Sequence, residues 1–331
     1  MFLKNLLAAG AAAALLAGAP AWAETQLKLA TDSGAKGSPS GDALDRWAAL
    51  IEEGTGGEVQ VDVFYQNELG SQAEVLDLLV AGDLDMMINW PITAYDNRLG
   101  VLFTPYMVRS WDEAFDAYKP GGWVNEILTG VFADLGLRFF GPGPEGFNGI
   151  ASRDKYAMTP EEAADLKIRV PAMFPMAESV QALGYQTETI DWSEVFTAIQ
   201  TGVVDGDGAN IIYWDYEYFR DVLDYYNQTK MQFITGVMTM NEGSWAGLSE
   251  EHQAVVAEAA NTVMEEAFAQ AQERDQFYIN KAKEAGMEYI EPTPEQIDEM
   301  ARKVRAEVWP MMEERVGKEI MDLVRANAAK L

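Results

Sequence analysis

The sequence predicts an α/β protein built as two lobes. Strand-like and helix-like segments alternate along the chain, and the same alternation starts again after residue 149. Such alternation indicates a mostly parallel sheet with helices on both faces. A stretch of roughly 36 residues without glycine or proline comes later, and as a helix it is long enough to span two lobes.

Residues 1–23 are set apart from this fold by their composition. Lys4 precedes an apolar run from Leu6 to Leu16, and the triplet Ala21-Trp22-Ala23 follows. This is the layout of a cleaved secretory signal peptide, and the run is shorter than the roughly 20 residues of a membrane-spanning helix. We therefore expect an exported chain that starts near Glu24 and does not itself span a membrane.

Charge and composition exclude several classes of partner and cofactor. The chain has 24 Lys and Arg against 53 Asp and Glu, a net charge of −29, with no cysteine and one histidine. The negative electrostatic field of such a chain repels nucleic acid, so we expect no nucleic-acid partner. Without cysteine there are no disulfides, thiolate nucleophiles or iron–sulfur ligands, and with one histidine nearly all zinc sites are excluded. We expect no cofactor and no metal.

The first lobe opens with strand, loop and helix units. Leu44, Trp47 and Ile51 recur at helical spacing until Gly54 stops the pattern. Read in this way, the lobe has strands at 27–32, 59–64 and 84–90 and helices at 43–54 and 71–82.

A glycine- and proline-rich segment, 139–149, separates the two series. Its two prolines and four glycines predict a break in regular structure and a crossover between lobes. Beyond it we expect strands at 166–171, 186–190, 203–210 and 231–241, helices at 172–184, 192–202 and 249–285, and a C-terminal helical region broken at Pro310. We place the first lobe at 24–146 plus about 235–262, and the second, with the C-terminal helices, at 147–234 plus about 263–331.

Arg169 is the main candidate for chemistry. Ligands of open α/β sheets bind at the carboxyl ends of strands, and Arg169 is the penultimate residue of the strand LKIRVP. Strand alternation turns it away from the apolar side chains of Ile168 and Val170. Its guanidinium suits a carboxylate, to which it offers two parallel donors. A salt bridge to a nearby Asp or Glu explains it equally well, and spacing alone does not decide.

At this point the chain resembles a known family. DLKIRVP followed by LGYQTETIDWSEVFTAIQTGVVDG, together with GSPSGDALDRWAALIEEGTGGEVQVDVFYQNELG, VLDLLVAGDLDM and LSEEHQAVVAEAA, is similar to the DctP-like solute-binding subunits of tripartite ATP-independent periplasmic (TRAP) transporters. The similarity covers nearly the whole mature chain. It implies a two-lobed periplasmic-binding-protein fold, with a mixed sheet in each lobe and one long helix that spans both.

The resemblance also implies a function. A receptor of this kind closes on a small organic acid in the periplasm, performs no catalysis, and delivers the acid to the small and large membrane permease subunits for ion-driven uptake. The hinge is expected near 141–149, around Thr235-Gly236 and along the long helix.

Two site residues carry over from the family by position. Arg169 matches the arginine that pairs with the ligand carboxylate, and Asn210 approximately matches an amide that contacts the same ligand. The family often has a second basic residue where this chain reads Phe147-Asn148, so the extra positive charge is missing. This departure argues against a dicarboxylate or a sialic-acid-like ligand. The opening loop offers only Lys36 and hydroxyl groups.

Aromatic residues gather at the same strand ends, and such rings can line a pocket. The candidates are Trp90, Phe147, Phe174, Trp192, Tyr213, Trp214 and Trp245. Ordinary core packing explains any single one of them. Together with one arginine they favour a monocarboxylate with an apolar, aromatic or zwitterionic body.

The alternatives are a C4-dicarboxylate or sulfonate receptor of the same class, a sensor, and a secreted enzyme that uses Asp191 and Glu194. Those two acids lie three residues apart at a helix start, where capping explains them. The acidic run Asp205-Gly206-Asp207-Gly208 lacks the rest of a calcium loop, so we interpret it as a turn.

Overall fold

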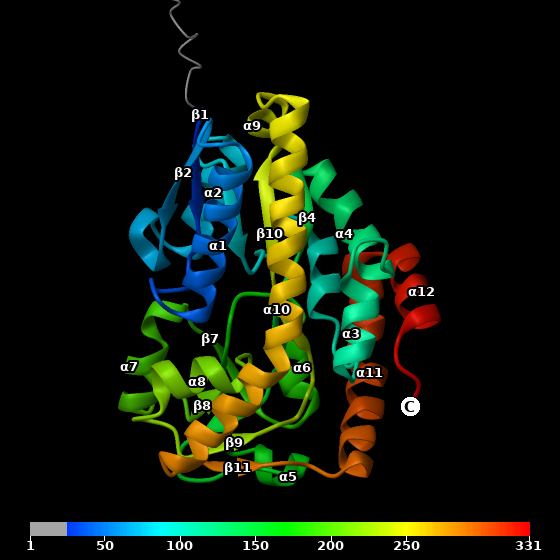
Figure 1. The fold of residues 1–331 in the computed structure, drawn as a ribbon. Coiled ribbons are helices and arrows are strands. Elements are labelled where there is room, and N and C mark those ends of the chain that lie inside the picture. The colour runs from blue at the N-terminus through cyan, green and yellow to red at the C-terminus, as the bar shows by residue number, and fades with distance from the viewer. Residues whose placement is uncertain (1–24) are drawn as a thin grey trace, which may run out of the picture.

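The computed structural model describes residues 25–331 and has the two expected lobes, one above the other in Figure 1. The signal peptide expected at 1–23 lies outside the described residues. The first lobe contains the strands β1 (Thr25–Ala30), β2 (Val59–Phe64), β3 (Met86–Asn89), β4 (Leu137–Phe147) and β10 (Phe233–Asn241). They form one sheet in the order β2-β1-β3-β10-β4, in which β1, β2 and β3 are parallel and β10 is antiparallel.

Helices cover this first sheet. They are α1 (Pro39–Gly54), η1 (Gln66–Leu69), α2 (Gln72–Ala81), η2 (Asn97–Phe103), α3 (Trp111–Tyr118), α4 (Trp123–Asp134) and α9 (Glu242–Ala246). Leu44, Trp47 and Ile51 of α1 are fully buried, as the helical spacing predicted.

The second lobe has a six-stranded sheet of shorter strands. They are β5 (Ile150–Ser152), β6 (Lys167–Val170), β7 (Gln186–Thr189), β8 (Gly206–Asp207), β9 (Tyr225–Asn227) and β11 (Glu288–Ile290), in the order β11-β9-β5-β8-β6-β7. Its helices are α5 (Pro160–Ala163), α6 (Met176–Ala182), η3 (Trp192–Glu194), α7 (Val195–Thr201) and α8 (Ile212–Phe219). The strands β6, β7 and β8 are parallel, so their carboxyl ends lie at one edge of the sheet.

The expected break at 139–149 is wrong for most of that segment, because β4 continues through both prolines. β4 is the last strand of its sheet, and among the strands of residues 25–331 it pairs with β10 alone. An edge strand tolerates proline, whose missing N–H group can point away from the sheet. The pairing with β10 adapts through two register shifts, and only residues 148–149 separate β4 from β5 of the second lobe.

One helix spans both lobes, as expected. This helix, α10 (Glu250–Glu284), contacts α1 and β4 in the first lobe and α8 and β11 in the second, and Figure 1 shows it along the full height of the molecule. Ser249 caps its start by accepting a hydrogen bond from the backbone N–H of His252 at 3.2 Å.

The two C-terminal helices differ from the expectation in one respect. The helix α11 (Pro294–Val316) continues through Pro310 and ends at Gly317, so the break expected at Pro310 is wrong. Gly317 takes the left-handed backbone conformation that ends the helix, and α12 (Lys318–Asn327) follows.

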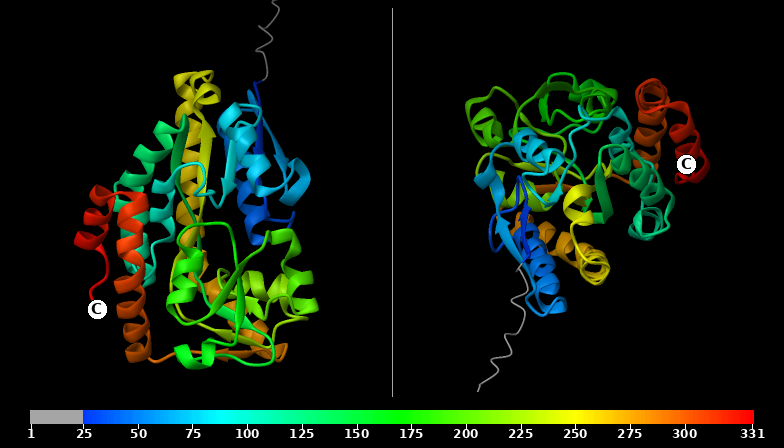
Figure 2. Two further views of the ribbon diagram at one scale, coloured as in Figure 1. Left: turned by 180° about the vertical axis from the view of Figure 1, so that it is seen from behind. Right: turned by 90° about the horizontal axis from the view of Figure 1, so that it is seen from above.

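The helix α11 lies beside both lobes, and α12 lies beside the first (Figure 2). α11 contacts η2 in the first lobe and α6 in the second, and α12 contacts η2 and α4. The lobe boundaries drawn from the sequence stay a prediction. Within residues 25–331 no helix is both long and apolar enough to cross a membrane.

Candidate functional site

A cavity lies where the carboxyl ends of parallel strands from the two lobes face each other. It encloses about 420 Å³ of space between atoms, part of it open to solvent. From the first lobe it is lined by residues that follow β1 and β3 and by the start of α2; from the second, by residues at the ends of β6, β7 and β8 and by α8. The lining residues are Asp32, Ser33, Gln72, Trp90, Arg169, Pro171, Met173, Trp192, Asn210 and Trp214.

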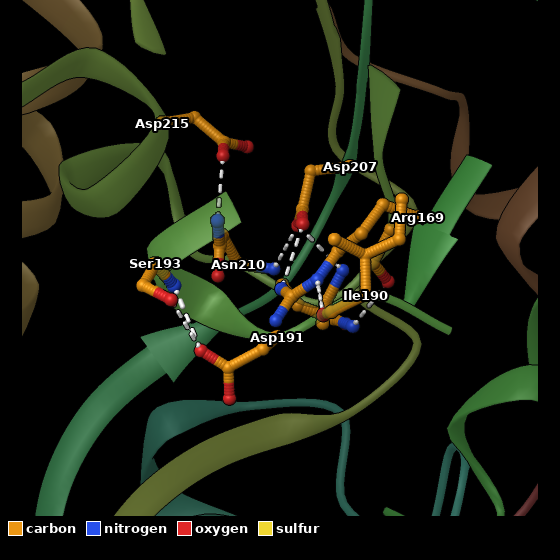
Figure 3. Close-up of polar contacts among 10 residues, drawn as sticks. Arg169, Ile190, Asp191, Ser193, Asp207, Asn210 and Asp215 are labelled. Carbon is orange, nitrogen blue, oxygen red and sulfur yellow. Dashed lines mark hydrogen bonds and ion pairs between the residues drawn. The ribbon is translucent and has the colours of Figure 1, made fainter. Parts of the chain in front are cut away.

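Arg169 reaches this cavity from β6 and is held on two sides. Its Nε donates to the carbonyl oxygen of Ile190, and its Nη1 donates to Oδ2 of Asp207, each at 2.9 Å (Figure 3). Arg169 is 3% exposed and Asp207 is fully buried. The internal salt bridge that the sequence left open therefore exists. Neither bond uses Nη2.

Asp207 anchors the turn beneath the cavity. Its Oδ1 accepts hydrogen bonds from the backbone N–H groups of Ala209 and Asn210, at 2.9 and 3.1 Å. Gly206 and Asp207 of the acidic run form β8, so the turn interpreted from the sequence is wrong for these two residues, and the chain turns only after them. Asp207, the second acid of the run, is the counter-ion of Arg169.

Asn210 is oriented from the side opposite to the cavity. Its Nδ2 donates to Oδ1 of Asp215 at 2.8 Å, as Figure 3 shows. Burial, and then the nearby charge of Asp207, raise the pKa of Asp215 well above its usual value. This favours a neutral Asp215 beside the ion pair of Arg169 and Asp207.

Three tryptophans form the walls of the cavity. Trp90 follows β3, Trp192 lies in η3, and Trp214 lies in α8. The rings of Trp192 and Trp214 meet edge to face, with their centroids 5.6 Å apart. Indole faces at this position suit an apolar or cationic ligand body.

Asp32 is the one cavity residue of consequence that the sequence reading missed. It lies two residues beyond β1 and is 7% exposed, and its Oδ1 has no hydrogen-bond partner among the described residues. Burial raises the pKa of Asp32 to about 7, and the charge of Glu145 adds to this shift. The argument that selected Arg169, a charged residue at the carboxyl end of a strand, also applies to Asp32.

Lys36, by contrast, lies outside the cavity lining. It is exposed, and its Nζ lies 5.4 Å from the centre of the Tyr65 ring. The opening loop therefore contributes the acid Asp32 and the hydroxyl residue Ser33 to the cavity lining, but not Lys36.

The structure brings together five of the ten residues selected from sequence: Arg169, Asn210, Trp90, Trp192 and Trp214. The other five do not line the cavity. Asn148 is fully buried. Its Nδ2 donates to Oε1 of Gln232, and its Oδ1 accepts from the backbone N–H of Gln232, both at 2.7 Å. These bonds join the two segments at which the chain passes between the lobes.

The remaining four are aromatic residues in packing contacts. Phe147 packs on Trp111 and Phe233, and Phe174 lies under the guanidinium of Arg315. Tyr213 contacts Tyr278 on the long helix, and Trp245 packs between Phe140 and Arg138.

The acids considered for an enzyme, Asp191 and Glu194, are exposed, and Asp191 caps η3 by accepting from the N–H of Ser193 at 3.0 Å. Among residues 25–331 no group of three or more potential metal-ligating side chains comes together. The geometry is that of a binding cavity with one cation, buried acids and aromatic walls.

Comparison with known proteins agrees with this geometry. The model of bacterial extracellular solute-binding proteins, family 7, matches residues 30–315. The ectoine-binding periplasmic protein TeaA of Halomonas elongata is 25% identical over 303 residues, covering 87% of this chain and 86% of its own. The C4-dicarboxylate-binding periplasmic protein DctP of Rhodobacter capsulatus is 26% identical over 341 residues and the full length of both chains.

A solved structure supports the same fold. The periplasmic ectoine-binding protein of the TeaABC TRAP transporter of Halomonas elongata superposes with a TM-score of 0.84 at 22% identity, covering 91% of this chain and 98% of its own. At this identity the likeness establishes the fold alone. With the family match over residues 30–315, the chain belongs to family 7 of the bacterial extracellular solute-binding proteins, the non-enzymatic receptors of TRAP transporters.

Proposed function

We propose that this receptor binds a small zwitterionic organic acid. The carboxylate of the solute pairs with Nη2 of Arg169 from the second lobe, and its cationic group pairs with Asp32 from the first. The observation that carries the proposal is the position of these two charges, one from each lobe, on the same cavity. A solute that contacts both stabilises the closed arrangement of the lobes.

The charges around the cavity support a solute without net negative charge. Arg169 is already paired with Asp207, and Asp32 adds a second acid on the cavity wall. A buried acid with an unpartnered oxygen is costly, and a cation that accepts it as a partner removes that cost. The second carboxylate of a dicarboxylate solute would lie beside the acid Asp32, which repels it, and not beside a base.

The aromatic walls support the same class of solute. The indoles of Trp90, Trp192 and Trp214 line the cavity, and a delocalised or alkylated cation binds an indole ring better than other aromatic rings. Ectoine, the solute in the name of the Halomonas elongata relative, carries a carboxylate and a delocalised cation in one small ring, so it heads the list of solutes to test.

We infer that the chain works in the periplasm and delivers its solute to the two membrane subunits of a TRAP permease. The family match and the signal-peptide layout of residues 1–23 support this. Mass measurement of the protein from the periplasm should give a chain that starts near Glu24. Reconstituted permease should then take up solute only with the receptor present, and uptake without it would contradict this role.

Calorimetry with a panel of solutes tests the ligand class. The panel holds three zwitterions (ectoine, glycine betaine and proline), the dicarboxylate succinate, the monocarboxylate glucuronate, and a sulfonate. We expect tight binding of at least one zwitterion, and weaker binding of that zwitterion to Asp32→Asn. The matched control is Lys36→Ala, which changes a charge on the same loop outside the cavity. Tighter binding of succinate than of every zwitterion would refute the proposal.

A further inference from the structure

The carboxylate of Glu145, which does not line the cavity, accepts hydrogen bonds from two of the tryptophans that do. Oε1 of Glu145 accepts a hydrogen bond from Nε1 of Trp90, and Oε2 accepts one from Nε1 of Trp214, both at 2.6 Å. Both indoles line the cavity, whereas Glu145 does not. Glu145 therefore acts on the cavity through the two tryptophans.

The two tryptophans come from different lobes. Trp90 follows β3, which lies in the same sheet as β4, the strand of Glu145. Trp214 lies in α8 of the second lobe. The bond to Trp90 therefore lies within the first lobe, whereas the bond to Trp214 joins the first lobe to the second.

The surroundings of Glu145 make the second bond matter. Hydrogen bonds to a charged carboxylate are short and roughly twice as strong as neutral ones. Arg274 of α10 supports this end of β4, since its Nη2 donates to the carbonyl oxygens of Pro144 and Glu145 at 3.1 and 3.2 Å. Burial raises the pKa of Glu145 above its usual value, and the two indole bonds and the charge of Arg274 offset only part of this rise. When the lobes separate at this bond, Oε2 of Glu145 loses the oriented N–H donor of Trp214 and takes water in its place.

We propose that Glu145 is the latch of lobe closure: its bond to the Trp214 indole holds the second lobe against the first and fixes both indole walls in place. In this role Glu145 is a positioning residue that sets the ratio of closed to open molecules. The proposal does not depend on which solute the cavity takes, because the latch lies outside the cavity lining.

A distance measurement between the lobes in ligand-free protein tests the latch. The natural chain has no cysteine, so nitroxide labels can be placed at two exposed helical positions, Ala49→Cys in α1 and Gln200→Cys in α7. Pulsed electron spin resonance then gives the distribution of distances between the lobes. Three single variants are compared in this background: Trp214→Phe, Trp90→Phe and Glu145→Gln.

Trp214→Phe keeps an aromatic ring and removes only the donor that crosses the lobes. Glu145→Gln keeps the shape of the side chain, but its amide offers one acceptor oxygen for two donors. We expect both to lower the closed fraction at least threefold, and the double variant to add little to either single one, because they break the same bond. Trp90→Phe is the matched comparison, since its bond lies within the first lobe, and it should lower the closed fraction much less than Trp214→Phe does.

Thermal unfolding followed by circular dichroism checks that each variant is folded. Wild-type distances in both Trp214→Phe and Glu145→Gln would overturn the latch. A shift in Trp90→Phe as large as that in Trp214→Phe would also overturn it, because the effect would then come from loss of cavity packing. The measurement uses no solute, so its outcome is separate from that of the calorimetric panel.

Discussion

Replacement of Arg169 should separate two roles that one side chain combines. Its Nη1 neutralises the buried Asp207, while Nη2 is the donor proposed for the solute. Arg169→Ala removes both, and it leaves Asp207 as a buried charge without a cation. Breaking a buried ion pair in this way costs about 3–5 kcal/mol of stability. Arg169→Lys keeps a positive charge near Asp207 but supplies only a single point donor.

The effect on binding follows from the number of donors lost. A hydrogen bond to a charged group contributes about 1.5–3 kcal/mol, and a lysine ammonium bound to Asp207 no longer offers the second arm of a fork to the solute. We therefore expect Arg169→Lys to weaken binding roughly 10- to 150-fold at near wild-type stability, since about 1.4 kcal/mol is tenfold in affinity.

The assay is calorimetry with the tightest-binding zwitterion of the panel, paired with chemical denaturation of each variant. Arg169→Ala should lose both affinity and stability. Wild-type affinity in Arg169→Lys would refute the role of Arg169 in solute binding. Wild-type stability in Arg169→Ala would refute the structural role of its pair with Asp207.

Three further predictions follow from two other residues, Asp32 and Pro310. The affinity for a zwitterion should rise about tenfold for each pH unit up to pH 7 and then level off, because the cation of the solute pairs with ionised Asp32, whose pKa burial raises to about 7. Calorimetry from pH 5 to 8 should show this slope in the wild type and not in Asp32→Asn. A slope that persists in the variant would assign the pH dependence to another group, such as Glu145. In ligand-free protein, folded Asp32 keeps a proton that the unfolded chain releases above about pH 4. The stability that protonated Asp32 contributes is therefore complete at acid pH and is lost as the pH rises through 7. Pro310→Ala should raise the free energy of unfolding by about 1–3 kcal/mol, as measured by chemical denaturation. The exposed Pro310 interrupts the hydrogen bonds of α11, and this cost exceeds the stability that proline gains by restricting the unfolded chain. An unchanged or lower stability of the variant would show that the helix is adapted to proline.

The regular elements of the sheets were predictable because their signals are local. Period-two alternation at 59–64 reproduced the bounds of β2, and the absence of glycine and proline after Ser249 gave α10 to within one residue at each end. The prolines of β4 and Pro310 misled the same reasoning. Whether a proline interrupts an element depends on which neighbour its missing N–H group faces, and that is a property of the tertiary structure.

The candidate site was predictable in part, for a related reason. The position of Arg169 at a strand end selected it, but its partner Asp207 lies 38 residues later in the chain and becomes a neighbour only through the pairing of β6 with β8. Trp90 and Trp245 look alike in sequence, and only the packing of the lobes places the first on the cavity and the second against Phe140.

The most direct test of the account is a crystal structure of the receptor with the tightest-binding solute of the panel. We expect the carboxylate of that solute at Nη2 of Arg169 and a cationic group at Oδ1 of Asp32, between the indole faces. A solute whose carboxylate lies away from Arg169, or whose body brings a second anion to Asp32, would contradict it.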